Sequence, residues 1–282
     1  MSTWQTGDVV SNGIRTHYLR SGGDKPPLVL LHGATDSGRC WTPIAEALTD
    51  DYDVVLPDAR GHGLSDAPHS GYSSAERAAD TAGLIQALGL ARVAVGGHSM
   101  GGQTTCRLAA DYPDLVACAI LEDPPFRPAQ SADARLSSVR QSMREEVAHL
   151  KGLSPESGLE YGRQRHPNWP EAELPAWVES KVQLSERFMS SPRDGEDLSW
   201  TSIVARINCP VLLVVGDANL GAIITLEVAE QACQLTPNLE VAHLAGAGHN
   251  IRREQSDAFV HAVRDFLARQ RLPSDPSVTA AG

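Results

Sequence analysis

The stretch VAVGGHSMGG at residues 93–102 decides the fold of this chain. An apolar run at 93–95 leads into the pattern Gly-x-Ser-x-Gly at 97–101, and a helix-like segment follows at 101–112. A serine between a strand and a helix sits on a strained, sharp turn that exposes its hydroxyl, and the flanking glycines let both elements approach closely. The helix directs N–H groups and its positive dipole end at the same point. We therefore predict Ser99 as a nucleophile; an incidental serine in a glycine-rich turn is the alternative interpretation.

Outward from this stretch, short apolar runs alternate with helix-like segments. Continuous apolar runs are typical of parallel strands that are covered on both faces, and their alternation with helices is the βαβ pattern. An earlier segment at 9–20 resembles a hairpin, because Asn12-Gly13 is a preferred two-residue turn. The predicted strands are 27–31, 53–56, 92–96, 117–121, 210–215 and 239–244, and the predicted helices are 41–48, 74–88, 101–112 and 257–269.

The regular spacing of strands is interrupted between 121 and 210. Helical patterns at 137–150 and 171–189 and much of the aromatic content fall in this stretch. We therefore predict a helical cap at 126–200 inserted into an α/β core at 1–125 and 201–271, followed by a flexible tail at 272–282. Side chains of the cap that are candidates for binding substrate in an apolar pocket, with packing onto the sheet as the alternative, are Phe126, Met143, Trp169, Trp177 and Trp200.

Composition and charge limit the function classes. The 282 residues carry 24 Lys and Arg against 35 Asp and Glu, a net charge of −11, which does not favour nucleic acid or anionic lipid as a partner. The five cysteines are odd in number and form no Cys-x-x-Cys pair, which favours reduced thiols in a cytoplasm. We expect a cytoplasmic protein without a secretory signal or a membrane helix, and with a small-molecule partner.

Two further segments complete the predicted site. A tetrahedral oxyanion needs two donors, and the expected pair is the N–H of Ala34, in the loop after the run at 27–31, and the N–H of Met100, directly after the serine. A serine hydroxyl also needs a positioned imidazole as its base. His249 lies in a glycine-rich loop after the last apolar run and is the predicted base. His32 and His243 are interpreted as structural histidines.

The residue that orients His249 is less clear from the residues alone. Its task is to accept the Nδ1–H of the imidazole and to stabilise the imidazolium. Two strand-end loops compete: Asp217 follows the run at 210–215, and Asp123, next to Glu122, follows the run at 117–121. Both remain candidates at this point.

The chain resembles the α/β-hydrolase superfamily in His32-Gly33, in DARGHGLS at 58–65, in GHSMG at 97–101 and in GAGH at 246–249. The resemblance implies a mostly parallel, doubly wound sheet with a helical cap. The usual place of the acid in the superfamily is Asn219 here, which is neutral, whereas a minority place it after the strand that follows the nucleophile, as Asp123 is. The segments at 11–20, 98–101 and 123–125 are similar to the N-formylmaleamate deformylase branch, whose acid is the aspartate of the matching Asp-Pro-Pro. The resemblance therefore favours Asp123.

These features predict a cofactor-free serine hydrolase that acts on a carboxylic ester or a lactone through an acyl-enzyme. The layout also resembles serine esterases that open macrolide lactones, which would link the protein to antibiotic resistance. Hydrolysis of an amide or a formamide is one alternative, and a ligand-binding member of the fold without activity is another. No spacing of His, Asp or Glu suggests a metal site.

Overall fold

The computed structural model describes residues 4–126, 133–191, 198–270 and 272. Apart from Leu272, the predicted tail therefore lies outside the described residues. In these ranges one eight-stranded sheet has the order β1-β2-β4-β3-β5-β6-β7-β8. The pairs β1–β2 and β2–β4 are antiparallel, and all others are parallel. The strands are β1 (Gln5–Ser11), β2 (Ile14–Arg20), β3 (Pro27–Leu31), β4 (Asp53–Pro57), β5 (Val93–His98), β6 (Val116–Glu122), β7 (Val211–Val215) and β8 (Leu239–His243).

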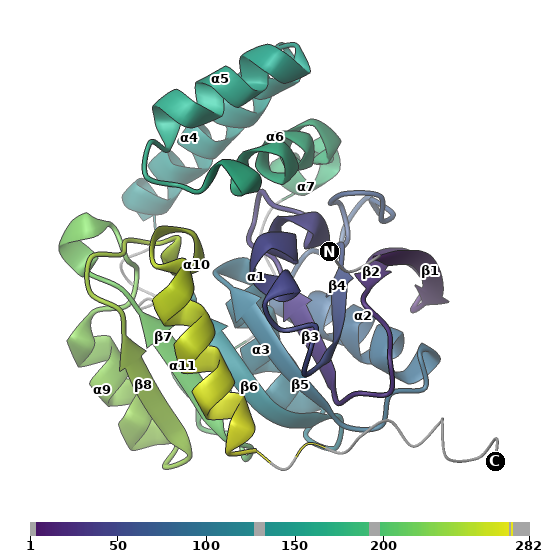
Figure 1. Cartoon of the computed structure of the whole chain (residues 1–282), viewed down its shortest axis with the longest axis vertical. Coiled ribbons are helices and arrows are strands. Elements are labelled where there is room, and N and C mark those ends of the chain that lie inside the picture. The colour runs from purple at the N-terminus through teal and green to yellow at the C-terminus, as the bar shows by residue number, and fades with distance from the viewer. Residues whose placement is uncertain (1–3, 127–132, 192–197, 271, 273–282) are drawn as a thin grey trace.

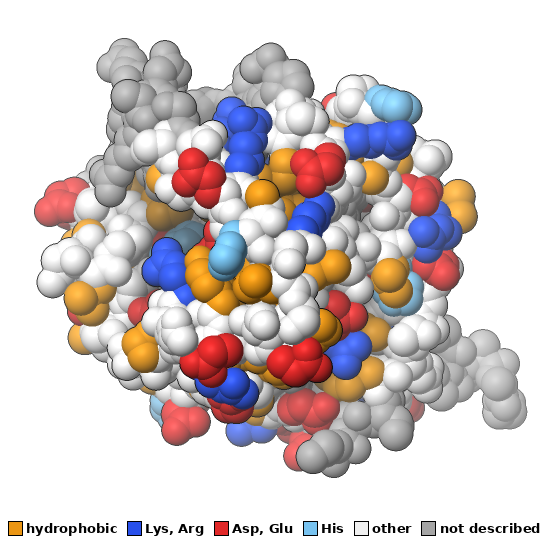
Figure 2. Space-filling model, turned by 90° about the horizontal axis from the view of Figure 1, so that it is seen from above, with side chains coloured by type: hydrophobic (Ala, Val, Ile, Leu, Met, Phe, Trp, Pro, Cys, Tyr) orange, Lys and Arg blue, Asp and Glu red, His pale blue; other side chains and the backbone are white. Residues whose placement is uncertain are grey.

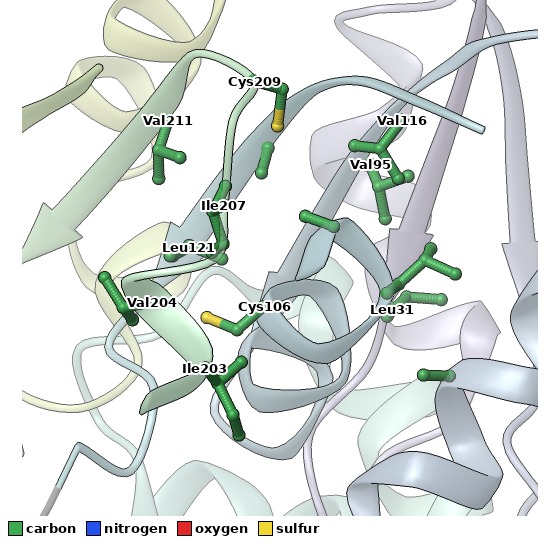
Figure 3. Packing of buried hydrophobic residues seen from close by; sticks show 14 of the residues in the cluster. Leu31, Val95, Cys106, Val116, Leu121, Ile203, Val204, Ile207, Cys209 and Val211 are labelled. Carbon is green, nitrogen blue, oxygen red and sulfur yellow. The ribbon is translucent and has the colours of Figure 1, made fainter. Parts of the chain in front are cut away.

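Strands β3 to β7 form where the apolar runs predicted them, because both of their faces are covered. β8 is largely exposed, and β1 begins at Gln5, before the segment predicted as a hairpin at 9–20. On β3, Val29 belongs to one apolar cluster and Leu28 and Leu30 to a second, so alternate side chains enter opposite layers. Figure 3 shows part of the first cluster, which contains Val95 and Val116 of strands together with Cys106 and Ile203 of helices. The two-residue turn between β1 and β2 has the positive φ values expected for this sequence, 53° at Asn12 and 72° at Gly13.

Helices cover both faces of the sheet (Figure 1). The first apolar cluster joins the sheet to α2, α3, α8 and α9, and the second joins it to α1 and α11. These helices are α1 (Thr42–Glu46), α2 (Ser74–Ala87), α3 (Met100–Asp111), α8 (Trp200–Val204), α9 (Leu226–Leu235) and α11 (Ser256–Ala268); α10 (Ile251–Glu254) precedes α11, and the 3₁₀ turns are η1 (Gly38–Trp41), η3 (Glu171–Glu173) and η4 (Ala218–Leu220).

Four further helices form a separate group above the sheet (Figure 1). They are α4 (Asp133–Lys151), α5 (Pro155–Arg165), α6 (Leu174–Gln183) and α7 (Glu186–Ser190). The helix predicted at 171–189 is broken, because Leu184 is extended with ψ 128° and the Ser185 hydroxyl accepts the N–H of Arg187 as the cap of α7. The group α4–α7 lies within the cap predicted at 126–200.

The surface above these helices carries charges of both signs. Seen from above, basic and acidic side chains are interspersed over the part of this face that the structure describes (Figure 2). No helix in the described ranges is long and apolar enough to cross a bilayer.

Candidate active site

Ser99 occupies the turn between β5 and α3. Its backbone has φ 51° and ψ −112°, a positive-φ conformation that costs energy for a residue with a side chain. The N–H of Ser99 donates to the carbonyl of Glu122 on the neighbouring strand at 2.9 Å, which fixes the turn to the sheet. The serine therefore has the strained backbone that the Gly-x-Ser-x-Gly pattern predicted.

The turn depends on glycines because backbone segments meet there. A Cβ atom added at Gly101 would lie 2.1 Å from the carbonyl oxygen of Leu31, and one added at Gly97 would lie 2.3 Å from the carbonyl oxygen of Gly101. Neither contact can be relieved by turning a side chain, because both partners are main-chain atoms.

We expect Gly101→Ala to lower the free energy of unfolding by about 3 kcal/mol or more, as overpacking against backbone does. Gly152→Ala is the matched control, because its added Cβ would lie 3.4 Å from the nearest atom, the carbonyl oxygen of His149. We expect that variant to stay within about 1 kcal/mol of the parent. Urea denaturation measures both, and equal midpoints for the two variants would contradict the tight approach.

The imidazole of His249 meets the carboxylate of Asp123. His249 Nδ1 lies 2.6 Å from Asp123 Oδ2, and Asp123 is fully buried directly after β6, with φ 42°. A carboxylate can only accept, so Nδ1 carries the hydrogen of this bond and Nε2 is left with its lone pair. The pair therefore presents His249 in the tautomer that a general base requires.

Backbone amides hold the buried carboxylate in place. Asp123 Oδ1 accepts the N–H groups of Ile223 and Ile224 at 3.0 and 2.9 Å, and its Oδ2 accepts that of Ile223 at 2.8 Å. These main-chain donors fix the orientation of both carboxylate oxygens. The loop after β7 thus contributes donors to this site rather than an acid.

Asp217, the competing candidate, lies elsewhere. Its Oδ1 pairs with His243 Nε2 at 2.7 Å, and its Oδ2 accepts the N–H of Gly246 at 2.7 Å. The Gly246 amide, and then His243, lower the pKa of Asp217. Glu122, the residue before Asp123, is fully buried and pairs with Arg252 at 3.2 Å. Of the three acids considered from the sequence, the structure brings only Asp123 to His249.

The loop of Ala34 lies beside the serine. Gly33 and Ala34 line the same cavity as Ser99 and His249, and Met100 is the first residue of α3. Among the described residues neither the N–H of Ala34 nor that of Met100 has a hydrogen-bond partner. The carbonyl of Ala34 is fixed instead, 2.9 Å from His62 Nε2.

The histidines around this loop have structural contacts. His32 Nε2 accepts the N–H of Ala59 at 2.9 Å, which ties the Ala34 loop to the segment at 58–65. His98 Nε2 donates to the carbonyl of His249 at 2.9 Å, and the two rings lie 4.7 Å apart. Burial, with Arg252 and His249 nearby, holds the pKa of His98 well below its usual value. His98 is therefore a neutral ring whose hydrogen bond holds the backbone of His249 in place.

A cavity of about 330 Å³ lies between Ser99, His249 and the cap. Three of the residues predicted for substrate binding line it, namely Met143, Trp169 and Trp177. The rings of Trp169 and Trp177 meet edge to face at 6.1 Å. Ligand cavities of this kind bury most of a small molecule against such aromatic walls.

The structure does not bring the other two predicted aromatic residues to this cavity. Phe126 and Trp200 stack on each other, with ring centroids 4.7 Å apart and planes inclined by 10°. Phe126 is buried in the apolar cluster of the sheet, and Trp200 packs against that cluster. Their stacking joins the two ends of the predicted cap. At these two positions the aromatic rings therefore pack onto the sheet, which was the alternative to substrate binding.

A comparison with protein families identifies the family of the chain. Residues 26–252 match the model of the α/β-hydrolase fold family. The chain belongs to this family. Eight strands in the order above, mostly parallel with helices on both faces, are the sheet of an α/β hydrolase in the described residues.

Two curated relatives match this α/β hydrolase over nearly its whole length. It is 31% identical to N-formylmaleamate deformylase of Pseudomonas putida, covering 95% of this chain and 98% of that protein. It is 27% identical to 2-(acetamidomethylene)succinate hydrolase of Mesorhizobium japonicum, covering 92% and 94%. The crystal structure of an N-formylmaleamic acid deformylase of Pseudomonas putida superimposes with a TM-score of 0.78 at 26% identity, covering 92% of this hydrolase and 100% of that chain.

Sequence reasoning missed the charged residues of the cavity. The lining includes two arginines and two acids, and each arginine has an acid partner: Arg165 lies 3.4 Å from Glu146, and Arg253 lies 3.1 Å from Asp36. Asp36 follows Ala34 closely in the sequence, and Arg253 follows His249 closely. This closeness to predicted site residues could have identified both as candidates for the cavity lining. Their pairing across 217 positions has no signal in a single sequence.

His166 also lines the cavity, stacked on Trp169 with ring centroids 3.7 Å apart. Burial, with Arg165 and Arg253 nearby, lowers the pKa of His166 to about 4. The ring is therefore neutral at pH 7.

We expect this hydrolase to lose stability as the pH falls, in part because His166 becomes protonated. In the unfolded chain the ring has its ordinary pKa of 6.5, so the unfolded state takes up the proton first. The free energy of unfolding should therefore decline between about pH 6.5 and about pH 4, by about 1–2 kcal/mol after allowance for the partial exposure of the ring. His166→Phe keeps an aromatic ring and should lack this component. Urea unfolding of both proteins at pH 7 and pH 4.5 measures it, and parallel losses would exclude His166 as the source.

The described residues contain no group of three or more His, Cys, Asp or Glu side chains placed to hold a metal ion. All five cysteines fall within these ranges and are free thiols.

Proposed function

We propose that this protein is a cofactor-free serine hydrolase in which Ser99 is the nucleophile, His249 the general base and Asp123 the residue that orients it. One observation carries the proposal: His249 Nδ1 lies 2.6 Å from the buried Asp123 carboxylate, while Ser99 and His249 line one cavity. The free N–H groups of Ala34 and Met100 would form the oxyanion hole.

The proposed reaction runs in two steps. Ser99 Oγ attacks the substrate carbonyl carbon while His249 Nε2 takes the hydroxyl proton, and the N–H groups of Ala34 and Met100 bind the developing oxyanion. The intermediate collapses as His249 returns the proton to the leaving oxygen or nitrogen. Water then attacks the acyl-enzyme with His249 as base, which releases the acid and restores Ser99. Asp123 stays ionised throughout and stabilises the imidazolium.

A carboxylic ester or a lactone without net charge is the proposed substrate. The charges of the cavity cancel, because Glu146 and Asp36 are paired with Arg165 and Arg253. Charge balance together with the walls of Trp169 and Trp177 favours an uncharged substrate with an apolar group. A volume of about 330 Å³ is near the lower end for ligand cavities and favours a compact ester or lactone over a macrolide.

Hydrolysis of an N-formyl amide is the second candidate. The relative with 31% identity is named a deformylase of N-formylmaleamate, and its match extends over 95% of this chain. The same catalytic residues would serve, because His249 can protonate a leaving nitrogen as well as an oxygen.

Covalent labelling tests the proposal directly. We expect a fluorophosphonate probe to add one adduct to the intact protein by mass spectrometry and to leave Ser99→Ala unlabelled. Mass-spectrometric screening of short p-nitrophenyl esters, simple lactones, N-formyl amides and macrolide lactones then distinguishes the bond classes. Turnover of N-formyl amides alone would replace the ester proposal, and an unlabelled, inactive protein would indicate a ligand-binding member of the fold.

A further inference from the structure

Six charged side chains are buried together beside the proposed active site. Each is at most 5% exposed, and they comprise three carboxylates and three cations, so their charges cancel. We call this group the Asp36 cluster; its members are Asp36, Glu122, Glu173, Lys181, Arg252 and Arg253.

Asp36 is the centre of the cluster. Its Oδ1 lies 3.2 Å from Lys181 Nζ, and its Oδ2 lies 3.1 Å from a terminal nitrogen of both Arg252 and Arg253. Burial opposes ionisation of Asp36, but Arg253, Lys181 and Arg252 together hold its pKa well below the usual value. One carboxylate thus carries the contacts of three buried cations.

These contacts join three segments that form the cavity. Asp36 lies two residues after Ala34, in the loop proposed to hold the oxyanion. Lys181 lies on α6 of the cap, where its Nζ also donates to the carbonyl of Thr35 at 2.8 Å. Arg252 and Arg253 follow His249 by three and four residues. The Asp36 carboxylate is therefore a common attachment point for the cap, the oxyanion loop and the segment of the base.

The outer members extend this attachment. Arg253 Nε donates to Glu173 at the start of α6 at 2.9 Å, and its Nη1 donates to Asn250, next to His249, at 3.2 Å. Arg252 binds Glu122 through both its N–H and its guanidinium, at 2.9 and 3.2 Å, and Glu122 directly precedes Asp123. Displacement of either arginine would disturb the chain next to a proposed catalytic side chain.

Stability alone does not account for such a cluster. Taking six charges out of water is costly, and well-packed apolar side chains of similar size often stabilise a protein at least as well. Buried ion pairs do impose one geometry, because each charge needs its partners at fixed positions.

We propose that Asp36 is a positioning residue that fixes the cap and the His249 segment against the oxyanion loop, and so sets the shape of the cavity for the hydrolysis. This inference rests on the proposed function. Asp36 acts through its partners: through Lys181 it determines how the cap closes on substrate, and through Arg252 and Arg253 it determines where His249 lies.

The test compares variants that separate these two directions. Lys181→Met removes the contacts of the cap with Asp36 and with the Thr35 carbonyl but leaves those of Asp36 with both arginines, so the KM for a p-nitrophenyl ester should rise about tenfold while kcat stays within about threefold. Asp36→Asn weakens the contact with Lys181 and also the contacts with Arg252 and Arg253, so kcat should also fall about tenfold. Asp36→Asn/Lys181→Met restores the charge balance of the cluster, so its Tm should recover towards that of the parent while its KM stays high and its kcat low.

Asp53→Asn is the matched control. Asp53 is also a buried carboxylate, at 1% exposure, and pairs with Arg20 at the first residue of β4, at the other end of the sheet from the strand ends that carry the cavity. We expect it to lower Tm without changing KM or kcat. Kinetic constants of the double variant that return to the parent values together with its Tm would overturn the inference, and so would Asp36→Asn constants that match those of Asp53→Asn.

A second measurement does not depend on activity. Hydrogen exchange of the amides in α6 and at 250–255 should become faster in Asp36→Asn than in Asp53→Asn, and equal exchange in both variants would overturn the positioning role. A parent protein that a fluorophosphonate does not label would refute the proposed hydrolysis instead. The exchange result would then still decide whether Asp36 holds these segments.

Discussion

Ser99→Ala is expected to abolish hydrolysis, with kcat lower by a factor of about 10⁶. The loss is this large because the alanine has no group that can form the acyl-enzyme, and His249 and Asp123 act only through the serine hydroxyl. The fold should persist, because the strained turn depends on Gly97 and Gly101 rather than on the hydroxyl. Turnover of a p-nitrophenyl ester and intact mass after fluorophosphonate treatment measure the effect.

Ser190→Ala is the control for this variant. Ser190 is exposed at the end of α7, where its hydroxyl donates to the carbonyl of Glu186 at 2.7 Å, and it does not line the cavity. We expect its turnover and labelling to equal those of the parent. Persistent labelling of Ser99→Ala at the parent rate would place the nucleophile elsewhere.

Asp123→Asn is the variant with the second largest expected effect, a loss in kcat of about 10⁴. The amide has nearly the same shape, and its oxygen can still accept the N–H groups of Ile223 and Ile224. Its NH₂ group, however, can no longer accept the Nδ1–H of His249, so the imidazole shifts to the tautomer whose Nε2 carries the hydrogen. That tautomer cannot take the proton of Ser99.

Asp217→Asn separates the two acids that the sequence left in competition. Asp217 pairs with His243, and we expect its variant to keep kcat within about threefold of the parent. A large loss in Asp217→Asn with an active Asp123→Asn would mean that the loop after β7 supplies the acid, and that the geometry around Asp123 serves structure only.

The strands of the core could be predicted because burial on both faces produces continuous apolar runs. The run at 27–31 coincides with β3, and the other runs differ from the observed strands by one or two residues at one end or at both ends. Ser99 was visible for a related reason, since the close approach of β5 and α3 requires glycines at fixed spacing. The buried strands and the turn at Ser99 both depend on residues that are close together in the sequence, and a short stretch of sequence is therefore enough to predict them.

The rest of the candidate site depends on contacts between distant segments. Asp36 and Lys181 form an ion pair although they lie 145 positions apart in the sequence. The residues next to either of them in the sequence do not indicate this pairing. The aromatic residues of the cap show the same limit. Trp177 and Trp200 are equally apolar, yet the first lines the cavity and the second stacks on Phe126, because the three-dimensional path of the cap decides which ring faces the opening.

The way in which Asp123 is held affects which sequence changes the site tolerates. Its carboxylate is anchored by the main-chain N–H groups of residues 223 and 224, and every amino acid except proline supplies such a group. At the half-buried position 223, the side chain can therefore vary in size and polarity without releasing the acid. Proline is the single replacement that removes the donor, so variation at position 223 is constrained by backbone chemistry, whereas Ile224 is also held by its side chain, which is buried in the first apolar cluster.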